Sequence, residues 1–110
     1  MEFKLEQVGD VTVAHVCVEF LNAGNVQDFK SEMAKILKPG SKVVLEMSRV
    51  KFVDSSGIGG LLSCVNNLSS ANTELRISNV TIQVRNLFDL VRVDRFLNVF
   101  NTSEEAVRSF

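Results

Sequence analysis

The first part of the chain alternates hydrophobic and polar residues in the way that is typical of β-strands. Phe3 to Gln7 predicts one strand, and Gly9-Asp10 predicts the turn that follows it. Val11 to Phe20 gives the strongest strand signal, because apolar residues occupy both of its faces. One face carries Ala14, Val16, Val18 and Phe20, and the other carries Val11, Val13, His15 and Cys17. We therefore expect this strand to be central in its sheet.

A helical spacing replaces the alternation after Asn22-Ala23-Gly24-Asn25. Asn25 is a suitable N-cap for a helix from Val26 to about Leu37. The apolar stripe of this helix consists of Val26, Phe29, Met33, Ile36 and Leu37. The turn at Pro39-Gly40 leads into a second apolar strand, Lys42 to Met47. Glu46 and Ser48 interrupt its outer face, so we expect that face to be partly solvated.

Another helix is predicted to follow Asp54-Ser55-Ser56 and to run to about Ser69. Its apolar stripe consists of Ile58, Leu61, Leu62, Val65 and Leu68. Three glycines near its start, Gly57, Gly59 and Gly60, lower the stability of the first turn by roughly 0.5–1 kcal/mol each relative to alanine. This concentration of glycine indicates the close approach of another chain or a ligand. Tight packing of the helix on the sheet is the alternative.

The last third of the chain continues the alternation of strands and helices. Glu74 to Ser78 predicts a strand, Thr81 caps a helix from Ile82 to about Leu90, and a short strand lies near Leu97 to Phe100. Thr102 and Glu105 form a capping box that opens a final helix. The predicted order is β-β-α-β-α-β-α-β-α, which indicates a mixed α/β fold with parallel crossovers.

Length, charge and cysteine content narrow the classes of function. A chain of 110 residues with a net charge of −1 suits one domain, residues 1–110, without an electrostatic surface for nucleic acid or for an anionic membrane. No apolar run is long enough to span a bilayer, and the N-terminal residues do not form a signal peptide. Cys17 and Cys64 are far apart and lack metal-ligand spacing. We expect two buried reduced thiols, no metal, no cofactor and a cytoplasmic location.

The signals for an enzyme are weak. A hydrolase serine turn requires G-x-S-x-G, which is absent, and His15, the only histidine, is predicted on a strand as a structural residue. Glu104 and Glu105 fall at a helix start, where acids stabilise the helix dipole. Gly57-Ile58-Gly59-Gly60 matches neither common phosphate-binding pattern. Three arginines, Arg85, Arg92 and Arg95, predict a solvated, salt-bridged surface, with a partner-binding rim as the alternative.

The serines between the second apolar strand and the following helix are the strongest candidates for function. A hydroxyl there lies where backbone N–H groups and the positive end of a helix dipole converge. A phosphate added at such a position gains hydrogen bonds but places roughly −1.5 to −2 charges on the surface. The alternative is that these residues have only structural roles, with Ser56 or Asp54 as the N-cap and Ser55 as a turn residue.

The run from Phe52 to Leu62 resembles the D-S-S/A-G-I/L-G signature of anti-sigma-factor antagonists, within the sulphate-transporter and anti-sigma-factor-antagonist (STAS) domain family. Val84 to Leu90, followed by Val93 to Phe96, is similar to the late helix of that family. The resemblance covers nearly the whole chain. It implies a small, mostly parallel sheet with about four helices, packed mainly on one face.

The resemblance also implies a function and a set of site residues. Ser55 would be the phosphorylated serine, Asp54 would orient the turn, and Ser56 would cap the helix. The implied partner is an anti-sigma factor that is also a serine kinase. It would bind the unphosphorylated chain and release it after phosphorylation. A phosphatase would then reset the switch. The chain would thus regulate transcription in bacterial signalling without being an enzyme. The implied partner-binding residues are Asp54, Ser55, Ser56, Gly57, Ile58, Gly59, Asn22 and Asn25.

Two residues differ from the family pattern near the end of the first long strand. Glu19 stands where the family often has glycine, and Asn22 stands where it often has aspartate. These differences fit an alternative function. In that alternative, the chain is a constitutive interaction module, either a scaffold in a signalling complex or a partner of a membrane transporter, and its serine turn is only structural.

Overall fold

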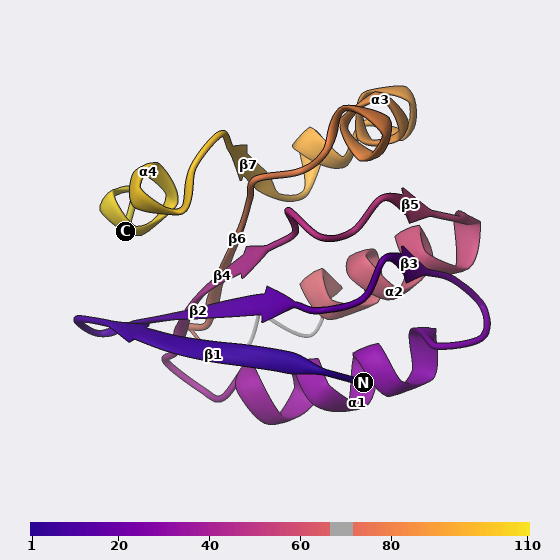
Figure 1. The fold of residues 1–110 in the computed structure, drawn as a ribbon. Coiled ribbons are helices and arrows are strands. Elements are labelled where there is room, and N and C mark those ends of the chain that lie inside the picture. Colours follow the sequence, from indigo (N-terminus) through magenta and orange to yellow (C-terminus); the bar gives the residue numbers. More distant parts are fainter. Residues whose placement is uncertain (67–71) are drawn as a thin grey trace.

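The computed structural model describes residues 1–66 and 72–110 and has a five-stranded sheet at its centre, in the order β1-β2-β4-β6-β7 (Figure 1). Strands β1 (Phe3–Val8) and β2 (Val11–Val16) form an antiparallel hairpin. Strands β4 (Lys42–Glu46), β6 (Glu74–Ser78) and β7 (Asn98–Phe100) add to β2 in parallel. The predicted order of strands and helices in this sheet is confirmed.

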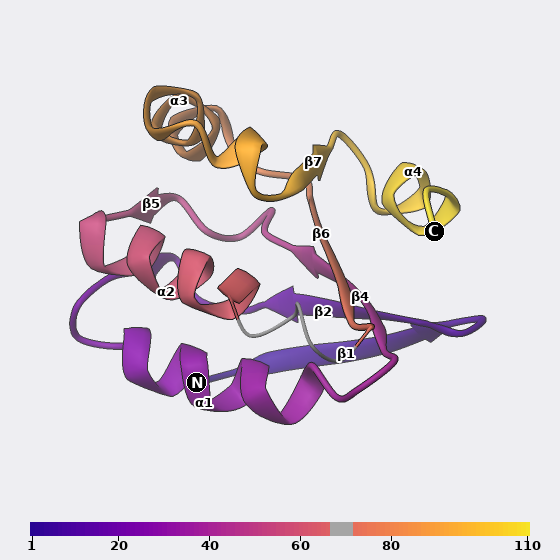
Figure 2. The same ribbon diagram turned by 180° about the vertical axis from the view of Figure 1, so that it is seen from behind.

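In the described part of the chain, four helices cover the sheet, and the first three of them lie between successive parallel strands. They are α1 (Val26–Ile36), α2 (Ser55–Asn66), α3 (Ile82–Val91) and α4 (Ser103–Arg108). Buried residues of α1, α2 and α3 share one core with Ala14 and Val16 of β2. Ala106 of α4 packs instead with Val11 and Val13, on the opposite face of the sheet. Both ribbon views show α1 and α2 together on one side of the sheet and α4 away from them (Figures 1 and 2). Helices thus pack mainly on one face.

The prediction of a single strand from Val11 to Phe20 is wrong. Strand β2 ends at Val16, and Phe20–Leu21 forms a separate strand, β3, which pairs in parallel with β5 (Phe52–Val53). The segment that follows the adjacent strand β4 explains the break. After β4, a turn in which the Val50 N–H donates to the Met47 carbonyl at 3.1 Å interrupts the ladder before it resumes at Phe52.

Glu46 is the second correction. Its side chain is buried rather than solvated, because His15 on the adjacent strand contacts its carboxylate at 3.2 Å. Ser48 is exposed, as predicted. The other differences are smaller: α1 ends at Ile36, α3 extends to Val91, and a 3₁₀ turn, η1 (Val93–Arg95), precedes β7. The expectations for Leu68 and Ser69 in α2 lie outside the described residues.

The predicted caps of the last two helices are confirmed. The Thr81 hydroxyl accepts from the Val84 N–H at 3.4 Å, at the start of α3. The Thr102 hydroxyl accepts from the Glu105 N–H at 3.1 Å, at the start of α4. The Glu105 carboxylate accepts from the Thr102 hydroxyl at 3.3 Å, whereas in a complete capping box it would accept from the Thr102 backbone N–H.

Candidate functional site

Strands β3 and β5 bring two segments of the predicted site together. Phe20 lies opposite Phe52, and Leu21 lies opposite Val53. The Asp54 N–H then donates to the Leu21 carbonyl at 3.2 Å. The loop from Asn22 to Asn25 and the serine turn therefore leave this small sheet side by side, although they are far apart in the sequence.

Asp54 is the N-cap of α2. Its carboxylate accepts from the Gly57 N–H at 2.9 Å, and its backbone carbonyl accepts from the Ile58 N–H at 3.0 Å. The other carboxylate oxygen accepts from the Ala23 N–H at 3.3 Å. The expectation that Ser56 caps the helix is wrong, because Ser56 lies within the first turn of α2. Asp54 thus orients the turn and also fixes the neighbouring loop.

Ser55 is the first residue of α2, and its side chain is exposed, whereas Ser56 is half-buried. Acceptance of a phosphate by Ser55 would therefore require no unfolding of the helix. The preceding residue, Asp54, carries a negative charge, and the helix dipole provides a partial positive charge. The charge of Asp54 would therefore repel a phosphate on Ser55, whereas the helix dipole would attract it.

The side chains of Asn22 and Asn25 hold the loop before α1. The Asn22 side-chain oxygen accepts from the Gly24 N–H at 2.9 Å, and the Asn25 side-chain oxygen accepts from the Asn22 N–H at 2.9 Å. The Asn25 amide donates to the Phe20 carbonyl at 2.7 Å. Asn25 occupies the N-cap position of α1, as predicted, but its side chain does not cap the helix. It stabilises the loop instead.

The three glycines of α2 have different environments. A Cβ at Gly57 would lie 2.5 Å from the Leu21 carbonyl oxygen, and one at Gly60 would lie 2.4 Å from a methyl group of Val26. Gly57 and Gly60 are therefore required by internal packing, which was the alternative to close approach by a ligand or another chain, and both are buried. Gly59 is exposed, and a Cβ there would meet nothing within 4 Å. Among these glycines, only Gly59 is open to a partner.

An apolar hollow of about 440 Å³ lies beside Ser55. Its lining consists of Phe52, Val53, Asp54, Ser55, Ile58, Gln83, Leu87 and Val91. Phe52 is 53% exposed and Val91 is 42% exposed. The sequence analysis missed the contribution of α3 to this surface. A signal was present, because Ile82, Leu90 and Val91 are apolar but lie outside the buried stripe formed by Val84 and Phe88.

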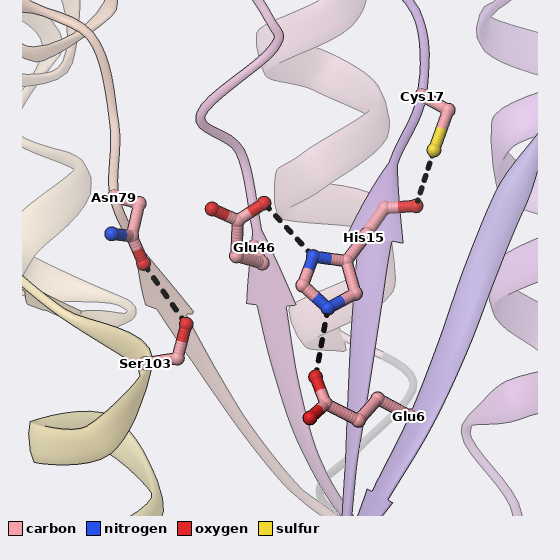
Figure 3. A network of polar contacts seen from close by, with 6 residues as sticks. All are labelled: Glu6, His15, Cys17, Glu46, Asn79 and Ser103. Atoms are coloured by element: carbon pink, nitrogen blue, oxygen red, sulfur yellow. Dashed lines mark hydrogen bonds and ion pairs between the residues drawn. The ribbon is translucent and has the colours of Figure 1, made fainter.

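His15 does not line this hollow and lies in a polar cluster with Glu6 and Glu46 (Figure 3). Its ring nitrogens contact Glu6 at 3.1 Å and Glu46 at 3.2 Å, and the Cys17 thiol donates to its backbone carbonyl at 3.5 Å. In the same view, the Ser103 hydroxyl donates to the Asn79 side-chain oxygen at 3.1 Å. Both ring nitrogens therefore have partners, as expected for a structural histidine on a strand.

Other candidate chemistry is sparse in the described ranges 1–66 and 72–110. No group of three or more His, Cys, Asp and Glu side chains there is placed to hold a metal ion.

Arg92 pairs with Asp94 at 3.3 Å on the surface, as expected for a solvated, salt-bridged region. No helix in the described residues is both long enough and apolar enough to cross a membrane. Cys64 is buried, as predicted, and Cys17 is half-buried.

Fold and turn together define a small α/β domain with an exposed serine at the start of a capped helix. The chain belongs to the STAS domain family, whose family model matches residues 2–106. BtrV of Bordetella bronchiseptica, a candidate anti-sigma factor antagonist, is 24% identical over all of this chain and 95% of its own length. The resemblance that the serine turn suggested is thus confirmed at the level of the family.

Solved structures show the same fold. A candidate anti-sigma factor antagonist of Thermotoga maritima superposes with a TM-score of 0.81 at 24% identity, covering 97% of this chain and 92% of that protein. The unphosphorylated form of the antagonist SpoIIAA gives a TM-score of 0.68 at 20% identity, covering 98% and 96%. The phosphorylated Bacillus SpoIIAA gives 0.65 at 22% identity, covering 98% of both chains.

Proposed function

We propose that this chain is an anti-sigma-factor antagonist that is switched by phosphorylation of Ser55. In the proposed cycle, the unmodified chain binds an anti-sigma factor with serine kinase activity, and this binding frees a sigma factor. Phosphorylation by that kinase then breaks the complex, and a phosphatase restores it. The chain itself performs no catalysis in this role and works in the cytoplasm.

One observation carries the proposal: an exposed Ser55 borders an apolar hollow that offers no positive charge. The side chains that line it are apolar, apart from Asp54, Ser55 and Gln83. A phosphate on Ser55 would place about two negative charges at the edge of this surface, with no lysine or arginine in the lining to neutralise them. A partner that covers the hollow would have to desolvate those charges, which costs several kcal/mol. A loss of about 1.4 kcal/mol already weakens binding tenfold.

The similar proteins support the proposal. BtrV and the Thermotoga maritima protein are both named as candidate anti-sigma factor antagonists, and SpoIIAA, which has the same fold, has been solved in phosphorylated and unphosphorylated forms. The partner surface that we infer comprises the serine turn, the exposed Gly59, the Asn22–Asn25 loop and the rim of the hollow.

Binding and phosphorylation of single-residue variants test this proposal. The kinase-type anti-sigma factor of the same organism would be purified, and its affinity for the chain measured by calorimetry, with phosphate transfer from ATP followed by mass spectrometry. Ser55→Ala should bind without being phosphorylated, and Ser55→Asp should bind at least tenfold more weakly. Ser56→Ala is the matched control and should still be phosphorylated. Unchanged affinity in both Ser55 variants would contradict the proposal.

A second function fits one specific observation. The Asn22 side chain is neutral and is engaged within its own loop by the Gly24 N–H. The chain also matches a part of the anion transporter Slc26a9, with a TM-score of 0.74 at 27% identity over 93% of this chain but only 18% of that protein. A constitutive interaction module would have the same fold without a phosphorylation cycle. An unmodified peptide from residues 52–60 under all growth conditions, recovered from a stable assembly in the cell, would favour it.

A further inference from the structure

Strand β1 forms an open edge of the main sheet. It pairs with β2 on one side, and in the described chain no other element hydrogen-bonds to its opposite side. The ribbon shows β1 as the outermost strand along that edge (Figure 1). An open edge presents a row of unpaired N–H and C=O groups that can add another strand.

The backbone of β1 shows which residues face this edge. The Cys17 N–H donates to the Glu2 carbonyl at 3.0 Å, in the register that places Phe3 opposite Val16. Because hydrogen-bonded pairs alternate along an antiparallel ladder, Glu2, Lys4, Glu6 and Val8 direct their backbone groups toward β2. Phe3, Leu5 and Gln7 therefore direct theirs to the open edge. Leu5 is also 57% exposed.

We propose that β1 pairs with β1 of a second copy of this chain, antiparallel about a two-fold axis at Leu5. In this register Leu5 lies opposite Leu5 of the second copy, and Phe3 lies opposite Gln7. These are the residues whose backbone groups face outward, so both pairs form hydrogen bonds. The two five-stranded sheets become one continuous sheet across a symmetric interface.

Charge selects this register. An axis at Leu5 places Lys4 opposite Glu6 of the second copy, twice, on one face of the sheet. An axis at Lys4 would place Lys4 opposite Lys4 and Glu2 opposite Glu6, and an axis at Glu6 would place Glu6 opposite Glu6. Like charges directly opposite one another destabilise a strand pair, whereas opposite charges stabilise it. An axis at Phe3 would pair Glu2 with Lys4 but would bring the two β1 strands opposite each other only at Phe3, because β1 begins at that residue.

Two further features are compatible with association of identical copies. The net charge of the chain is −1, so two copies repel each other only weakly. The start of α2, which carries Ser55, lies beside β5 and away from β1 in both ribbon views (Figures 1 and 2). The proposed dimer therefore leaves the serine turn accessible.

Charge-swap variants of β1 test the register by sedimentation equilibrium over a concentration series. Lys4→Glu and Glu6→Lys each place like charges opposite one another, and each should weaken the dimer by about tenfold. The double variant restores opposite charges and should recover wild-type affinity. Lys38→Glu makes the same charge change on an exposed residue outside β1 and should have no effect.

Leu5→Pro provides a second test that does not depend on charge. The Leu5 N–H faces the open edge, so proline is tolerated within the monomer but removes two hydrogen bonds from the proposed pair. Circular dichroism should show a folded variant, and sedimentation should show a monomer. A wild-type chain that stays monomeric at all concentrations, or a dimer that the single charge variants leave unchanged, would overturn the proposal. Neither result depends on whether Ser55 is phosphorylated.

Discussion

The carboxylate of Asp54 accepts a hydrogen bond from the Ala23 N–H at 3.3 Å, across 31 residues of sequence. The same carboxylate caps α2 through Gly57 at 2.9 Å. One side chain thus joins the loop before α1 to the helix that presents Ser55. Because its carboxylate accepts both hydrogen bonds, Asp54 holds the structure of the candidate site as well as being part of it.

Replacement of Asp54 tests its role as the cap of α2. Asp54→Ala removes the cap and the bond to Ala23, and it should lower the free energy of unfolding by about 0.5–2 kcal/mol. Asp54→Asn is the matched variant, because asparagine caps helices about as well as aspartate. It should retain most of the stability. Urea unfolding measures both, and an Asp54→Ala variant as stable as the wild type would contradict the assignment of Asp54 as the cap.

The glycines of α2 predict opposite effects for the same substitution. Gly57→Ala forces a methyl group against the Leu21 carbonyl and Val53, and Gly60→Ala forces one against Val26. Each should lower the free energy of unfolding by about 1–3 kcal/mol, as overpacking does. Gly59→Ala meets no neighbour and should raise stability by up to about 1 kcal/mol, because alanine favours the helix. Thermal unfolding of the three variants checks this, and equal effects at the three positions would be inconsistent with the packing.

The ion pair between Asp10 and Lys42 predicts a local effect of pH. The Lys42 ammonium donates to the Asp10 carboxylate at 2.9 Å, and this hydrogen bond lowers the pKa of Asp10 and raises the pKa of Lys42. The stabilisation from Asp10 is therefore present above its unfolded pKa of about 3.9 and is lost as the pH falls through its lowered pKa. The stabilisation from Lys42 is present below the ordinary lysine pKa and is lost as the pH rises through the raised one.

Titration of the Asp10 carboxyl carbon by NMR measures this coupling. Lys42→Met should return the pKa of Asp10 toward its ordinary value, because the hydrogen bond from the ammonium is its main cause. Lys38→Met is the control and should leave the pKa of Asp10 unchanged. Salt should weaken the coupling, since both groups lie at the surface. An Asp10 pKa that does not respond to Lys42→Met would rule out the pair in solution.

The two cysteines should differ in reactivity. Burial raises the pKa of the Cys64 thiol to about 11, so very little thiolate is present at neutral pH. Cys17 is half-buried and has greater access to solvent. Alkylation followed by mass spectrometry of the peptides should modify Cys17 first and Cys64 only as the chain unfolds in urea. Rapid modification of Cys64 in the folded chain would contradict its position in the core.

The parts of the fold that depend on local sequence were predictable. The spacing of apolar residues predicted the helices and strands, and Thr81 and Thr102 were identified as caps because their hydrogen bonds are made within one helical turn. The break between Val16 and Phe20 was missed, because it depends on a turn in the neighbouring strand. The burial of Glu46 was missed for the same reason, since its partner His15 lies on another strand.

Prediction of the candidate site from the sequence was limited in the same way, because several of its contacts join distant parts of the chain. Any of three consecutive residues could cap this helix: Asp54, Ser55 or Ser56. The structure shows that Asp54 is the cap and that it also accepts a hydrogen bond from Ala23. No local sequence pattern reveals that second hydrogen bond. The glycines were noticed, but only the fold shows that Gly57 meets Leu21 and Gly60 meets Val26. The apolar hollow was missed because one of its walls comes from α3, far along the chain.

The pairing of β3 with β5 means that the surface around Ser55 is a conformational epitope. Its two strands come from positions near Phe20 and near Phe52, and each holds the other in place. A synthetic peptide covering residues 52–60 would contain the serine but neither β3 nor Ala23. A kinase that recognises this surface would therefore phosphorylate the folded domain and leave such a peptide unmodified, and an antibody raised against the peptide would recognise the unfolded chain better than the native one.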